Sequence, residues 1–165
     1  MTTNNVPKTT DAPTAPVRAP VGQQPAELPD LTATGAFLQA AGLQLDEVTG
    51  TRVSGRIELT AAQHTPWGVV HGGVYTTAAE TAASVGASTA VADRGQFAVG
   101  VHNSTDFLRA ATGGTVKVTA TPVQQGRIQQ LWHVAITRED GKELDRAQVR
   151  LQIVDRPTPA QGVRS

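Results

Sequence analysis

One carboxylate stands alone in the middle of the sequence. Between Leu59 and Ala92 the only Asp, Glu, Lys or Arg is Glu80, which lies in a run of small and apolar residues. Glutamate is almost never fully buried without a partner, and a carboxylate in an apolar cleft is suited to acid–base or nucleophilic chemistry. Glu80 is therefore the first candidate for a catalytic residue. The alternative is a structural role, in which neighbouring hydroxyl groups or a strand backbone bind the carboxylate.

The residues His71, Gly72 and Gly73 precede Glu80 in the same segment. Glycine lets the backbone approach a ligand closely, and free N–H groups at a helix start point outward with the positive end of the helix dipole. Such N–H groups can stabilise an oxyanion that develops on a carbonyl. A simple turn at the two glycines is the alternative.

The segment from Gly72 to about Ala92 is rich in alanine and predicts one helix of roughly five turns. Thr76, Glu80 and Ser84 recur every four residues and share one helix face. Gly72 and Glu80 are about 12 Å apart along such a helix, too far to contact one carbonyl easily from the same chain. The spacing favours an active site shared by two antiparallel copies of the helix in a dimer.

The flanking segments alternate with period two. Residues 43–60 predict a two-strand hairpin after a short helix that ends at Gly42, and strand-like runs follow the long helix at 96–108, 115–123, 128–137 and 144–154. This order predicts an α+β fold, an antiparallel sheet curled round one central helix. A helix with so little charge has to be buried nearly all round, so we expect the sheet on one side and a second subunit on the other.

The composition excludes several classes of function. Fourteen basic residues balance fourteen acidic ones, which does not suggest a nucleic-acid or anionic-membrane partner. The lack of cysteine excludes disulfides, a thiolate zinc site and a cysteine nucleophile. The four histidines lack metal-ligand spacing, so we expect no metal. No membrane span or signal peptide is evident, which predicts a cytoplasmic protein.

The two ends of the chain differ from its middle. Residues 1–30 hold most of the ten prolines and almost no large apolar side chain, which predicts a disordered tail. Residues 157–165 look similar and predict a second flexible tail. The length of 165 residues then leaves one domain, over residues 31–156.

The run GVVHGGVYTTAAETAASVGAS, followed by VGVHNSTDFLRAATGG, resembles the hotdog-fold acyl-CoA thioesterases. It is similar to the 4-hydroxybenzoyl-CoA thioesterases and the phenylacetate-pathway (PaaI-like) enzymes, with Glu on the helix as in the Arthrobacter type. The resemblance covers roughly residues 35–155. It implies a hotdog fold, hydrolysis of an aromatic or medium-chain acyl-CoA, no cofactor beyond the CoA of the substrate, and a homodimer that pairs into a tetramer.

The resemblance also implies roles for particular residues. The Gly72 N–H would contact the thioester carbonyl, Glu80 of the second subunit would act as nucleophile or general base, and Ser84 would place the water. Members usually carry Gln or Asn six residues before the motif histidine, where this chain has Thr65, with Gln63 and His64 nearby as substitutes. The remaining candidates are His71, which we expect to orient the loop, Arg109 and Arg127 for CoA phosphates, and Gly73 and Asn103 for other contacts to substrate or CoA.

Two alternatives stay open at this point. Hotdog hydroxyacyl-CoA dehydratases also pair a loop histidine with a helix acid, and His64 with Glu80 would fill those parts, although such enzymes typically open the helix with Pro-Gly. A non-catalytic acyl-CoA-binding protein is the second alternative, which the presence of Thr65 favours.

Overall fold

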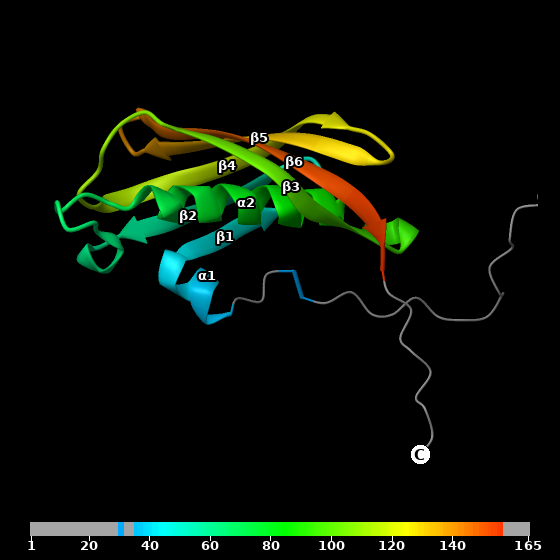
Figure 1. Cartoon of the computed structure of the whole chain (residues 1–165), viewed down its shortest axis with the longest axis horizontal. Helices are drawn as coiled ribbons and strands as arrows, with labels where there is room; N and C mark the ends of the chain where they lie inside the picture. The colour runs from blue at the N-terminus through cyan, green and yellow to red at the C-terminus, as the bar shows by residue number, and fades with distance from the viewer. Residues whose placement is uncertain (1–29, 32–34, 157–165) are drawn as a thin grey trace, which may run out of the picture.

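The computed structural model describes residues 30–31 and 35–156. The elements run in the order α1 (Ala36–Ala41), β1 (Leu43–Val48), β2 (Val53–Leu59), η1 (Ala61–Gln63), α2 (Gly72–Thr89), η2 (Ala92–Arg94), β3 (Gln96–Phe107), β4 (Gly114–Gln125), β5 (Gln129–Arg138) and β6 (Glu143–Asp155). The strands form one antiparallel sheet in the order β1-β2-β4-β5-β6-β3. This sheet curls round α2, which confirms the predicted α+β fold (Figure 1).

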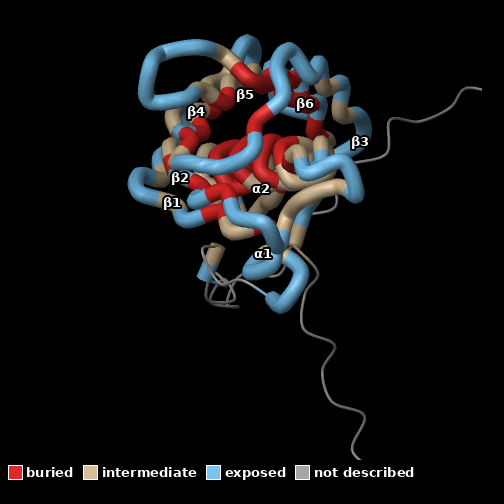
Figure 2. Tube along the Cα trace, turned by 90° about the vertical axis from the view of Figure 1, so that its left-hand side faces the viewer, coloured by how far each residue is buried: buried red, intermediate tan, exposed pale blue. Residues whose placement is uncertain are grey.

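The alternating strands turn their apolar side chains towards α2. Leu43 pairs with Ile57 across β1 and β2, and Val118 pairs with Ile136 across β4 and β5. Directly opposite residues of an antiparallel pair point to the same face of a sheet, so each pair adds two side chains to the core. Figure 2 shows the buried residues along α2 and on the strand segments that surround it.

The small residues of α2 allow the sheet to approach the helix closely. Ala78, Ala79, Ala82 and Ala83 are fully buried against the sheet. Trp132, the largest buried side chain, packs directly on the helix at Gly86: a Cβ added there would lie 2.7 Å from Cζ3 of Trp132, so only glycine leaves room for the ring. The next largest of the fully buried side chains are Ile57, Ile136, Leu144 and Leu151.

The opposite face of α2 is largely uncovered by the sheet, and only the edge strand β3 reaches it, at Glu80. Thr77, Glu80, Thr81 and Ser84 lie on this face and are only half-buried. The expectation of a helix buried nearly all round is therefore met on one side alone within a single chain. The second subunit expected on the other side stays a prediction.

The boundaries of the elements agree closely with the predicted ranges, with one difference. α2 ends at Thr89 rather than near Ala92, because Val91 leaves the helical conformation at φ −123° and is fully buried. The predicted tails, 1–30 and 157–165, fall outside the described residues apart from residue 30. None of the helices in the described part of the chain combines the length and hydropathy that a membrane crossing requires.

Candidate active site

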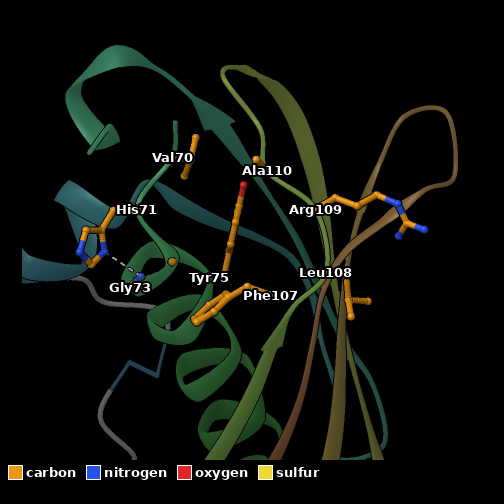
Figure 3. Close-up of a pocket in the computed structure, with 9 residues that line it drawn as sticks. Val70, His71, Gly73, Tyr75, Phe107, Leu108, Arg109 and Ala110 are labelled. Carbon is orange, nitrogen blue, oxygen red and sulfur yellow. Dashed lines mark hydrogen bonds between the residues drawn. The ribbon is translucent and has the colours of Figure 1, made fainter. Parts of the chain in front are cut away.

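His71 caps the first turn of α2. Its Nδ1 accepts a hydrogen bond from the Gly73 N–H at 2.9 Å, and its backbone carbonyl accepts one from the Val74 N–H at 3.0 Å (Figure 3). A Cβ added at Gly73 would lie 2.9 Å from the same Nδ1, so a glycine is needed for this cap. With Nδ1 used as an acceptor, Nε2 is the ring nitrogen that can donate.

The N–H of Gly72 is the group of this turn that is left available. The N–H groups of His71, Gly73 and Val74 all have acceptors in the loop or the first turn. Within residues 30–31 and 35–156, the Gly72 N–H has no such acceptor. An unpaired N–H at a helix start carries the positive end of the helix dipole, so it can stabilise a negative charge on a carbonyl oxygen.

A cleft of about 540 Å³ opens beside this N–H, between the start of α2 and the end of β3. Figure 3 shows the Phe107 ring next to the first turn of the helix, and a Cβ added at Gly72 would lie 2.8 Å from that ring. Glycine at position 72 thus permits an aromatic ring to approach the backbone closely. The cleft is lined mainly by apolar groups, from Val70, His71, Gly72, Gly73, Tyr75, Phe107, Leu108, Arg109 and Ala110.

Glu80 lies in a different cleft, of about 380 Å³, on the uncovered face of α2. Its Oε2 accepts a hydrogen bond from Asn103 Nδ2 at 2.9 Å, and its Oε1 accepts one from Ser84 Oγ at 3.4 Å. The structure thus brings three predicted site residues together round one carboxylate. The residues that line this cleft are Phe37, Leu38, Thr76, Thr77, Glu80, Thr81 and Asn103.

The two clefts have no lining residue in common. Gly72 and Glu80 lie on one helix, about 12 Å apart along its axis. A single chain therefore presents an available N–H and a carboxylate that face separate spaces.

Thr65 does not line any of these clefts. Its Oγ1 donates to the Val69 carbonyl at 3.1 Å and its N–H donates to the same carbonyl at 2.7 Å, which closes the loop between them. The two suggested substitutes also bind the main chain. Gln63 Nε2 donates to the Ala41 carbonyl at 3.1 Å, and His64 Nε2 lies 3.0 Å from the Thr112 carbonyl oxygen. These two side chains line a third cleft, of about 440 Å³, together with His71.

The two candidate arginines lie at opposite ends of the sheet. Arg109 is exposed after the end of β3, beside the cleft at Gly72, and its guanidinium donates to the Glu143 carbonyl. In Figure 3 its side chain extends away from His71 and α2. Arg127 is exposed in the turn between β4 and β5, one strand length away. Within one chain only Arg109 lies near a cleft described above.

Two buried polar residues near the cleft at Gly72 were not expected from the sequence: Tyr75 lines it, and Asp145 pairs across the strands with Phe107, which also lines it. Asp145 is fully buried on β6, and neither of its carboxylate oxygens has a hydrogen-bond partner among the described residues. Burial, and after it the charges of Asp106 and Glu143, raise the pKa of Asp145 to about 7. Burial, and then the charge of Asp145, also raises the pKa of Tyr75.

A signal for Asp145 was present in the alternation of β6. Asp145 is two residues before Ala147 and four before Val149, and all three are fully buried. The same period-two rule places Asn103 and Thr105 together on the face of β3 that meets α2. Sequence spacing thus indicated which side chains share a face, but not which atoms on the helix they contact.

Comparisons with known proteins identify the family and the fold. Residues 68–144 match the family model described as the thioesterase superfamily. A candidate esterase of Mycobacterium tuberculosis is 39% identical over 124 residues, which cover 74% of this chain and 89% of that protein. The solved structure of that esterase has a TM-score of 0.71 to this chain, and the match covers 74% of this chain and 98% of that one.

Two further relatives extend the comparison. The 1,4-dihydroxy-2-naphthoyl-CoA hydrolase of Listeria monocytogenes is 30% identical over 106 residues, or 64% of this chain and 85% of that protein. The crystal structure of AziG from S. sahachiroi is 36% identical, with a TM-score of 0.71 over 74% of this chain and 98% of that one. The predicted hotdog fold is confirmed. The chain belongs to the hotdog-fold thioesterase superfamily and is a thioester hydrolase.

Proposed function

We propose that the protein hydrolyses aromatic or medium-chain acyl-CoA thioesters to the free acid and CoA. One observation carries the proposal: α2 bears both an available N–H, at Gly72, and a lone carboxylate, at Glu80, each facing an open cleft. An oxyanion-stabilising donor and a carboxylate that acts as base or nucleophile are sufficient groups for the hydrolysis of a thioester.

In the proposed reaction the thioester carbonyl oxygen accepts a hydrogen bond from the Gly72 N–H. Glu80 acts as general base or as nucleophile. As a base, it takes a proton from a water held near Ser84, and the hydroxide adds to the carbonyl carbon to form an oxyanion. The oxyanion then collapses, the carbon–sulfur bond breaks, and the CoA thiolate leaves and is protonated. The reaction needs only water and the acyl-CoA itself, so we propose no further cofactor. We also propose that the reaction takes place in the cytoplasm.

The separation of the clefts supports a site that two copies complete. Because Gly72 and Glu80 of one chain face different spaces, the Gly72 N–H would meet Glu80 of a second copy whose α2 runs antiparallel. The uncovered, half-buried face of α2 is the surface on which such a copy would lie. We propose a homodimer with two equivalent sites, and two such dimers in a tetramer.

The cleft at Gly72 supports an aromatic substrate. Phe107 and Leu108 supply apolar surface next to the oxyanion-binding N–H, and flat apolar groups stack favourably on an aromatic ring. A relative named for hydrolysis of 1,4-dihydroxy-2-naphthoyl-CoA makes bicyclic aromatic acyl groups the first to test. The exposed guanidinium of Arg109, at the mouth of the same cleft, is the proposed partner of a CoA phosphate.

The proposal is tested with a panel of aromatic and straight-chain acyl-CoA esters, by following free thiol through disulfide exchange. We expect turnover with at least one ester and its loss in Glu80→Gln, which removes the charge and keeps the shape. Glu47→Gln is the matched control, because Glu47 is an exposed carboxylate of β1 paired with Arg52. Full turnover in Glu80→Gln, or binding of esters without hydrolysis across the panel, would contradict the proposal.

The dehydratase alternative requires His64 and Glu80 to act on one substrate. These two residues line different clefts of the chain, and His64 Nε2 already lies at hydrogen-bond distance from the Thr112 carbonyl. We therefore expect that the protein does not hydrate an enoyl-CoA. Hydration would be detected as a loss of the ultraviolet absorbance of the enoyl-CoA, and we expect that absorbance to stay constant.

A further inference from the structure

We infer that Asn103 is a positioning residue that holds the Glu80 carboxylate in place for catalysis, and not a contact to the substrate. The inference rests on the proposed role of Glu80. Asn103 lies on β3, and its Nδ2 donates to Glu80 Oε2 at 2.9 Å across the gap between strand and helix.

The orientation of the Asn103 amide follows from its two side-chain partners, Glu80 and Thr105. Thr105 Oγ1 donates to Asn103 Oδ1 at 2.7 Å, from two residues along the same strand face. The ionised Glu80 carboxylate can only accept, so the end of the amide that faces it is Nδ2, and the Thr105 hydroxyl then donates to the other end, Oδ1. Thr105, Asn103 and Glu80 thus form a chain of hydrogen bonds that runs from the strand to the carboxylate.

The Asn103 side chain has little bonding capacity left for a ligand. One hydrogen of its amino group serves Glu80, and Nδ2 also lies 3.5 Å from the Thr76 carbonyl on α2. Its oxygen accepts from Thr105. An amide in this state would have to break a bond to Glu80 or Thr105 before it contacted a substrate.

The backbone of β3 leaves room for the carboxylate at the same place. A Cβ added at Gly100 would overlap Glu80 Oε1. The β3–β6 pairing is irregular between Gly100 and His102, so the strand departs from regular pairing where Glu80 approaches it. Glu80 is therefore held by Asn103 on one oxygen and by Ser84 on the other, against a backbone with no side chain.

This arrangement restricts a side chain that has three rotatable bonds. A hydrogen bond to a charged group is stronger than one between neutral groups, and a misplaced catalytic group lowers the rate of the chemical step. Since Asn103 acts on Glu80 alone, its loss should lower kcat by roughly 10-fold to 100-fold and leave KM nearly unchanged.

The test compares Asn103→Leu, which keeps the size of the side chain and removes its polar atoms, with Thr105→Val. We expect Asn103→Leu to lower kcat as stated and Thr105→Val to lower it by a smaller factor, with KM within about threefold of the parent in both. Ser104→Ala is the matched control, since Ser104 is exposed on the opposite face of β3. A rise in KM with unchanged kcat would instead assign Asn103 to the substrate and overturn the inference.

A second measurement separates this inference from the proposed function. Crystal structures of the parent and of Asn103→Leu show directly whether the Glu80 carboxylate moves. A displaced or multiply oriented carboxylate in the variant supports positioning, and a carboxylate that keeps its place against Gly100 overturns it. Loss of turnover in Glu80→Gln tests the catalytic role of Glu80 by itself, so the failure of one idea does not hide the failure of the other.

Discussion

The buried carboxylate of Asp145 should make the protein less stable as the pH rises. Its pKa stands at about 7, against an ordinary value of 3.8, chiefly because the group is buried. The folded chain therefore holds this proton more tightly than the unfolded chain does. Between pH 4 and 7 the unfolded state binds fewer protons at this site, so the free energy of unfolding falls as the pH rises.

The size of the effect follows from the two pKa values. Each pH unit of difference corresponds to about 1.4 kcal/mol, so ionised Asp145 costs the folded state on the order of 4 kcal/mol above pH 7. Of this, about 3 kcal/mol should develop between pH 4.5 and pH 8. Asp145→Asn keeps the shape of the side chain and removes the ionisation. The stability of the variant relative to the parent should therefore rise by about 3 kcal/mol over that range.

Urea unfolding at several pH values measures this difference, with both proteins at the same concentration because self-association would add to stability. Asp140→Asn is the control. The Lys142 backbone N–H lowers the pKa of the exposed Asp140, so the stabilisation that ionised Asp140 provides is lost as the pH falls. The stability of Asp140→Asn relative to the parent should therefore change with pH in the direction opposite to that of Asp145→Asn. A difference between Asp145→Asn and the parent that changes by less than about 1 kcal/mol over the range would refute the reasoning.

Three further substitutions test the packing and the cap. Gly86→Ala should destabilise the protein by about 1–3 kcal/mol in urea, since the new Cβ overlaps the buried Trp132 ring and this outweighs the gain in helix propensity; an unchanged midpoint would contradict the close contact. His71→Ala should lower the free energy of unfolding by about 1 kcal/mol through loss of the helix cap, and a thermal melt that does not shift would argue against that role. Trp67→Ser should change stability by less than about 0.5 kcal/mol, because Trp67 is 85% exposed, and a larger loss in the same melt would mean that something covers it.

The fold was predictable because its signals are local. Alternation gave the strands, and the alanine-rich run gave α2, to within a few residues at each end. The short helix ends at Gly42 as predicted, where φ is 78°, and Gly114 and Gly141 have φ values of 90° and 79°, which other residues rarely adopt. The end of α2 was less predictable, since burial of Val91 against the sheet is a tertiary effect.

The site was predictable only in part, for a physical reason. The isolation of Glu80 and the glycines at the helix start are visible along the chain, and both do face clefts. The bond between Asn103 and Glu80 depends on how β3 lies across α2, which no spacing along the sequence defines. The same holds for Arg127, whose distance from the cleft at Gly72 follows from the path of β4.

The lack of charge along α2 serves the sheet and the site in different ways. On the inner face, Ala82 and Gly86 let the sheet close round the helix, because a longer side chain would push Trp132 and its strand away. On the outer face, Thr77 and Thr81 are short enough to leave an open cleft beside Glu80. A lysine or arginine there would fill that space and offer the carboxylate a competing partner. A second charged side chain on this face of α2 would fill the space beside Glu80 or change the charge that the proposed hydrolysis uses, although the hydrogen bonds from Asn103 and Ser84 leave both intact.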